Sequence, residues 1–189
     1  MNGGRKLIDM KKLFVGLFEL VSLSMSAQQY QSIDLLEYNL TQDSIRFYML
    51  EYLNEFRVKH YKSPLTYDSA LNVGALNHSL YLACHNEFTH TATETNSPYF
   101  TGRRPTQRCG MPASENIASR WQYVSLNATP KQIAKSLIDQ WEQSPGHRAN
   151  MLEDHRYFGF GLSLRKHDGS HGKLDVYAVQ TFSRRLEFK

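Results

Sequence analysis

The side chains best suited to chemistry in this 189-residue chain are its eight histidines and two cysteines, and none of them stands in a complete enzyme signature. His85 and His90 flank Glu87, but the two histidines are five residues apart. The helix of a zinc protease needs them four residues apart, so that both face the metal. The chain also has no Gly-x-Ser-x-Gly turn for a nucleophilic serine. We therefore expect any site to be assembled from separate segments.

The N-terminal segment predicts export. Lys6, Lys11 and Lys12 precede an apolar run at 13–27 that ends in small residues. This order is typical of a secretory signal peptide over residues 1–27, with cleavage near Ala27. The run is shorter than the roughly 20 residues that span a membrane. We expect a secreted or periplasmic protein.

Export bears on Cys84 and Cys109, because disulfides persist in oxidising compartments. A bond between them would close a loop of about 25 residues and contribute on the order of 3 kcal/mol. The sequence therefore predicts a Cys84–Cys109 disulfide, with two buried free thiols as the alternative. The chain has no Cys-x-x-Cys pair, so a cysteine-ligated metal is not expected.

The composition is that of a folded domain, with 41% hydrophobic and 21% charged residues. The net charge of +4 is spread along the chain, including Arg103, Arg104 and Arg108 in one segment. A nucleic-acid-binding protein needs a clustered basic stripe or a known motif. We expect no nucleic-acid partner.

Two helices are predicted after a polar lead-in at 28–40. Apolar residues recur at helical spacing through 45–56, and Thr41 or Asp43 is a suitable N-cap. A second helix is expected at about 69–86, after the capping residue Asp68.

Two more helices follow further along the chain. Thr129, Pro130 and Gln132 form a capping box with proline at the first helical position. A short helix is expected from Ser144-Pro145 to Leu152 by the same reasoning.

The remaining segments predict a long loop at 91–114 and strands at 157–164 and 174–182. The strands flank Asp168-Gly169, a hairpin-turn signal. Helices first and strands last predict an α+β domain, which we place at residues 41–189.

Several segments in this order resemble the CAP superfamily of cysteine-rich secretory, antigen 5 and plant pathogenesis-related proteins, especially its bacterial branch. The similarity spans about residues 45–182. One departure is Ser114, where the family has Gly. Glycine adopts backbone conformations that serine disfavours, so the direction of the Glu115 side chain is left open at this point. The matching segments are 65–83, Phe88-Thr89-His90, Glu115-Asn116-Ile117-Ala118, Trp141 with Ser144-Pro145-Gly146-His147-Arg148-Ala149-Asn150, 158–161 and 177–182.

The resemblance implies a three-layer α-β-α sandwich with a central, mostly antiparallel sheet and a surface cleft. In the family, two histidines and two acidic residues line that cleft. Carried over by position, they are His90, His147 and Glu115, and the fourth place falls to Glu142 or Gln143.

Two imidazoles and a carboxylate from separate segments suit Zn²⁺ with an open position for water. His90 and His147 are then the metal ligands. The same groups could exchange protons without a metal, since histidine titrates near neutral pH. A third interpretation is structural: His147 hydrogen-bonds to Glu115 and locks a loop.

The resemblance favours a non-enzymatic binding module with a His/Glu-lined cleft and, at most, weak Zn²⁺ binding. Its partner is an unidentified protein, lipid or cell-envelope ligand, and the chain acts as a monomer or weak dimer. One alternative is a zinc-dependent, peptidase-like hydrolase with Glu115 as the base. Another is lipid or sterol binding in an apolar cavity between helices.

Overall fold

The computed structural model describes residues 35, 40–122, 128–166 and 174–184, which lie within one compact unit, Ser32–Lys189. The predicted signal peptide at 1–27 and the turn at Asp168-Gly169 lie outside the described residues. Of the predicted lead-in, Leu35 and Leu40 are described, and both are buried in the core. The polar lead-in thus contributes apolar anchors where it meets the domain.

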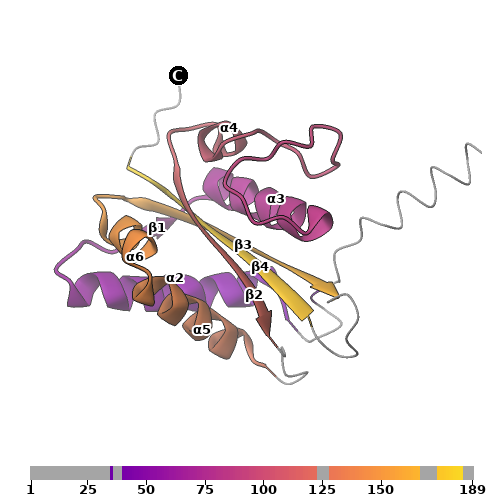
Figure 1. Ribbon diagram of the computed structural model, residues 1–189. Helices are drawn as coiled ribbons and strands as arrows, with labels where there is room; N and C mark the ends of the chain where they lie inside the picture. The colour runs from indigo at the N-terminus through magenta and orange to yellow at the C-terminus, as the bar shows by residue number, and fades with distance from the viewer. Residues whose placement is uncertain (1–34, 36–39, 123–127, 167–173, 185–189) are drawn as a thin grey trace, which may run out of the picture. The chain divides into compact units, whose positions relative to one another are not determined.

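The described residues form a four-stranded sheet between two layers of helices (Figure 1). The strand order is β1-β3-β4-β2, with β1 parallel to β3 and the other pairs antiparallel. The predicted α+β sandwich with a mostly antiparallel sheet is confirmed. In chain order the elements are α2 (Gln42–Lys59), β1 (Thr66–Tyr67), α3 (Ser69–His85), α4 (Pro105–Cys109), β2 (Ser114–Gln122), α5 (Pro130–Gln143), α6 (Pro145–Leu152), β3 (Tyr157–Lys166) and β4 (Leu174–Ser183).

The helices begin where local capping signals predict. The side-chain oxygens of Thr41, Asp68 and Thr129 each accept the backbone N–H of the residue three positions on. At Thr129 the reciprocal bond from the N-cap N–H to the Gln132 side chain completes the capping box. These bonds satisfy helix N–H groups that have no partner within the helix.

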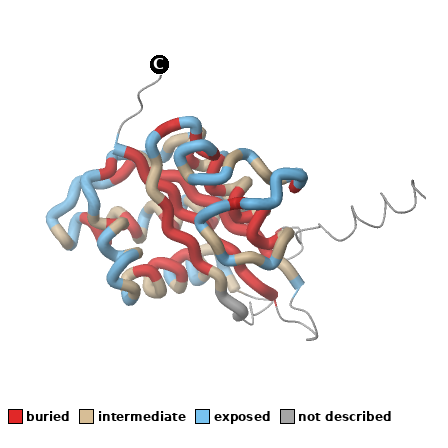
Figure 2. The backbone as a smooth tube through the Cα atoms, turned by 45° about the horizontal axis from the view of Figure 1, so that its top comes forward, coloured by how far each residue is buried: buried red, intermediate tan, exposed pale blue. Residues whose placement is uncertain are grey.

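Strand β4 lies at the centre of the core, and its side chains alternate between two apolar clusters. Val176, Ala178 and Phe182 face the cluster that contains residues of α2, α5 and α6. Tyr177 and Val179 face the cluster built on α3. Figure 2 shows the buried strands between more exposed helices and loops.

Helix α3 lies unusually close to β3 at two glycines. A Cβ added to Gly159 would lie 2.3 Å from the backbone of Leu71, and one added to Gly161 would lie 2.3 Å from the Cα of Leu76. Only glycine allows this approach.

The predicted loop at 91–114 contains more structure than expected. It includes the short helix α4, and at Ser114 it passes into β2, a strand that the sequence pattern did not predict. Both elements position residues of the candidate site.

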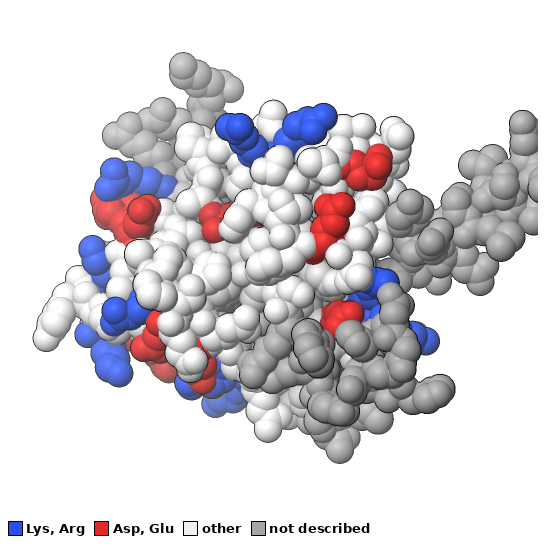
Figure 3. All heavy atoms as spheres, viewed as in Figure 1, with Lys and Arg blue, Asp and Glu red and all other residues white. Residues whose placement is uncertain are grey.

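The surface that Figure 3 shows has basic and acidic side chains interspersed over the described residues. Among the described helices, none is long and apolar enough to cross a bilayer.

Candidate functional site

Glu115 on β2 is the centre of a polar cluster on the α3 side of the sheet. Its side chain is only 1% exposed. Nη2 of Arg108 donates to Oε2 at 2.7 Å, and Nδ1 of His90 lies 3.0 Å from Oε1. Nε2 of His78 lies 3.6 Å from the same oxygen. A buried carboxylate is therefore held by a guanidinium and approached by two imidazoles.

Arg108 was not recognised as a site residue from the sequence. It lies on α4, its side chain is also 1% exposed, and its guanidinium donates to the carbonyl oxygens of His90, Gly102 and Arg103. It therefore fastens both ends of the loop at 90–103 as well as Glu115. The available signal was Pro105, which starts a helical turn three residues before Arg108.

His90 is the exposed member of the cluster, with 54% of its side chain accessible. Because a carboxylate only accepts hydrogen bonds, its contact with Glu115 places the proton of a neutral His90 ring on Nδ1. Nε2 is then the nitrogen left for a ligand. A carboxylate behind a histidine in this way fixes the tautomer and orients the ring.

His147 lies in the first turn of α6 and is half-buried. Burial lowers its pKa, and the electrostatic influence of nearby His90 acts in the same direction. In the described part of the chain, the Glu115 oxygens contact Arg108, His90 and His78, and the structural interpretation of a His147–Glu115 hydrogen bond has no such bond to support it. Asn116 instead donates to the His147 carbonyl oxygen at 3.2 Å.

A buried amide network joins β2 to α6. Asn150 donates to Oδ1 of Asn116 at 2.9 Å, and the Ser114 hydroxyl donates to Oδ1 of Asn150 at 2.9 Å. Ser114 is not among the described residues with positive φ, so the glycine usual in the family is not required for this backbone. The departure at Ser114 therefore adds a contact rather than misdirecting Glu115.

His78 is fully buried on α3, and its ring also faces Glu115. Nε2 lies 2.9 Å from the carbonyl oxygen of Thr89, and Nδ1 has no hydrogen-bond partner among the described residues. Burial lowers the pKa of His78 to about 4, although Glu115 acts in the opposite direction. His78 is neutral at pH 7.

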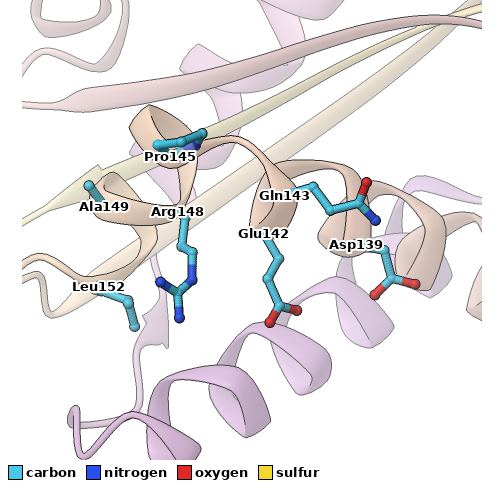
Figure 4. A pocket seen from close by; sticks show the side chains of 7 residues that line it. All are labelled: Asp139, Glu142, Gln143, Pro145, Arg148, Ala149 and Leu152. Carbon is cyan, nitrogen blue, oxygen red and sulfur yellow. The ribbon is translucent and has the colours of Figure 1, made fainter.

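Glu142 and Gln143, the two candidates for the fourth cleft position, line a hollow whose lining does not include His90, Glu115 or His147. That hollow also includes Asp139, Pro145 and Arg148, at the corner between α5 and α6 (Figure 4). Within the described ranges, no group of three or more His, Cys, Asp or Glu side chains is arranged to hold a metal. A metal at this site would rest on His90 and His147 alone.

The predicted Cys84–Cys109 disulfide is wrong, because both residues are free thiols. The sulfur of Cys109 lies against Gly74, 2.5 Å from where a Cβ there would be. Gly74 and Cys84 both lie on α3, ten residues apart, which places them about 15 Å from each other at 1.5 Å per residue. A disulfide requires Cα atoms within about 7 Å. Burial raises the pKa of the Cys109 thiol to about 12, so it stays protonated.

Comparison with known proteins agrees with this architecture. The model of the CAP family, the cysteine-rich secretory protein family, matches residues 50–182. The chain belongs to this family. No curated protein matches it significantly.

Two solved structures share the fold of this CAP domain. An outer surface protein from Borrelia burgdorferi is 18% identical, with a TM-score of 0.56, and the match covers 82% of this chain and 99% of that one. An extracellular protein containing an SCP domain from Bacillus anthracis is 23% identical, with a TM-score of 0.50. That match covers 77% of this chain and 44% of the Bacillus protein. At these identities the likeness supports the fold alone.

Proposed function

We propose that this CAP domain is a secreted binding module that takes its ligand through His90 and His147 without hydrolysing it. The predicted signal peptide at 1–27 supports export. The two structural neighbours, described as an outer surface and an extracellular protein, point the same way.

The contact between Arg108 and Glu115 carries this proposal. A hydrolase of the predicted kind needs Glu115 to take a proton from water. A carboxylate that is 1% exposed is shielded from substrate, and one of its oxygens is occupied by an equally buried guanidinium at 2.7 Å. Such a group is a poor general base. It is well suited to hold His90 in one orientation.

The two histidines favour a borderline metal ion as one ligand of the site. Neutral imidazole nitrogen is a good ligand for Zn²⁺, and a carboxylate behind His90 strengthens it. Structural zinc sites use four protein ligands and catalytic ones three. A site with two protein ligands binds more weakly and leaves positions open for water or a partner's side chain.

The lipid-binding alternative has less support. It needs an apolar cavity, and the two hollows along α5 and α6 do not supply one, because most of the residues that line them are polar. Native mass spectrometry after incubation with membranes tests it directly.

The decisive experiment is zinc titration of the purified chain by calorimetry. We expect one equivalent to bind to the wild type and to His60→Ala, a control at the residue that caps the C-terminal end of α2. His90→Ala and His147→Ala should each abolish it. Zinc binding that persists in both variants would refute the assignment. Turnover of peptide, ester or glycan libraries that is lost in His147→Ala would refute the non-enzymatic function.

A further inference from the structure

Two adjoining hollows follow α5 and α6, away from the Glu115 cluster. The first, of about 710 Å³, is the one that Glu142 lines, and the second is of about 570 Å³. Both include Asp139 and Gln143, so they form one continuous depression, the α5–α6 groove. The groove shares no lining residue with the His90, Glu115 and His147 site.

Among the described residues, two charged side chains of this groove form no ion pair, although Glu142 lies close enough to Lys135 to help Asp139 raise the pKa of that lysine. Asp139 forms an ion pair with Lys135, but within the described ranges Glu142 has no cation and Arg148 no carboxylate as ion-pair partner. Figure 4 shows the Glu142 carboxylate and the Arg148 guanidinium extending in the same direction from the α5–α6 corner. The groove therefore presents one negative and one positive group side by side.

Arg148 is held in place by α2. Nη2 donates to Nε2 of His60 at 2.9 Å, and the guanidinium lies 5.9 Å from the centre of the Phe56 ring. Nδ1 of His60 lies 2.8 Å from the carbonyl oxygen of Phe56, so the ring accepts from Arg148 while donating to the backbone. Holding a guanidinium in advance lowers the entropy lost when a ligand binds it.

The rest of the lining combines carboxamides with small apolar side chains. Gln132, Gln140 and Gln143 line the groove together with Ser136, Pro145, Ala149 and Leu152. A carboxamide both donates and accepts, as each unit of a peptide backbone does. Gln143 is exposed, so its carboxamide is accessible to the backbone of a bound peptide.

We propose that the α5–α6 groove binds an extended peptide segment that carries both a basic and an acidic side chain. The basic group pairs with Glu142 and the acidic group with Arg148, while the backbone bonds to the glutamines. Pockets for small molecules are mostly apolar and aromatic. This groove has no aromatic residue among its described lining, so it offers no flat apolar face to a sugar ring or a lipid tail.

The test uses three fluorescent pools of blocked octapeptides. One contains a lysine and a glutamate at varied spacing, one has glutamine in place of lysine, and one has glutamine in place of glutamate. Fluorescence anisotropy should show the doubly charged pool binding best. Glu142→Gln should weaken its binding about two- to five-fold, the effect expected for one partly screened charge pair. Glu55→Gln, an exposed carboxylate on α2 outside the groove, is the matched control and should have no effect.

Arg148→Gln is the second variant and should remove the advantage that the peptide glutamate confers. Equal binding of all three pools, or equal effects of Glu142→Gln and Glu55→Gln, would overturn the proposal. Amide shifts of groove residues with chitin oligosaccharides but not with peptides would overturn the ligand class. His90→Ala and His147→Ala should leave peptide binding unchanged, so this proposal and the zinc-binding proposal can fail separately.

Discussion

Replacing Arg108 with methionine should strongly destabilise the domain. The change removes the cation of a pair whose side chains are both 1% exposed and 2.7 Å apart, and strands the Glu115 carboxylate in the interior. Exposed ion pairs contribute less than about 1 kcal/mol, but breaking a buried pair costs about 3–5 kcal/mol. Three loop carbonyls also lose their donor. We expect the free energy of unfolding to fall by about 3–5 kcal/mol at pH 7.

Urea unfolding of a double-mutant cycle measures this effect. Glu115→Gln removes the stranded charge, so the double variant should be more stable than the sum of the two single losses predicts. A loss below about 1 kcal/mol, or additive losses in the double variant, would refute the buried-pair argument.

Three further predictions rest on other parts of the fold. Burial holds the pKa of His78 at about 4, below its unfolded value of about 6.5. The free energy of unfolding should therefore fall as the pH drops from 6.5 towards 4, by up to roughly 3 kcal/mol, and urea midpoints should show this fall. A His78→Gln variant with the same pH profile would contradict it. Gly161→Ala should lower the free energy of unfolding by about 1–3 kcal/mol, because the new methyl group pushes α3 away from the sheet. Gly146→Ala, with nothing within 4 Å of the new methyl group, should leave the melting temperature unchanged. Equal losses of stability in the two variants would be inconsistent with the close approach of α3 to β3. Thiol titration of the denatured, unreduced protein should detect two free thiols, those of Cys84 and Cys109, and reductant should leave the melting temperature unchanged. If no free thiol is detected, the two cysteines form a disulfide and our conclusion is wrong.

The helices were predictable because their signals are local. Asp68 and Thr129 cap the helices that they precede through hydrogen bonds to a residue only three positions further along the chain. Both partners of each bond therefore lie within one short stretch of sequence. Strand β2 was missed because its partner is remote: Ser114 pairs with Phe182 and Gln122 with Leu174. Because the partner strand lies more than 50 residues away in the sequence, residues 114–122 alone contain no signal of the pairing.

The sequence by itself determined the family resemblance, the α+β class, the helix starts and the candidate residues His90, Glu115 and His147. Only the tertiary structure revealed that Arg108 pairs with Glu115, that Glu142 lines a hollow between α5 and α6, and that the two cysteines are free. The physical reason is that each of these depends on where side chains from different elements meet. Helix α4 turns Arg108 inwards, and Cys109 packs at Gly74, too far along α3 from Cys84 for a bond.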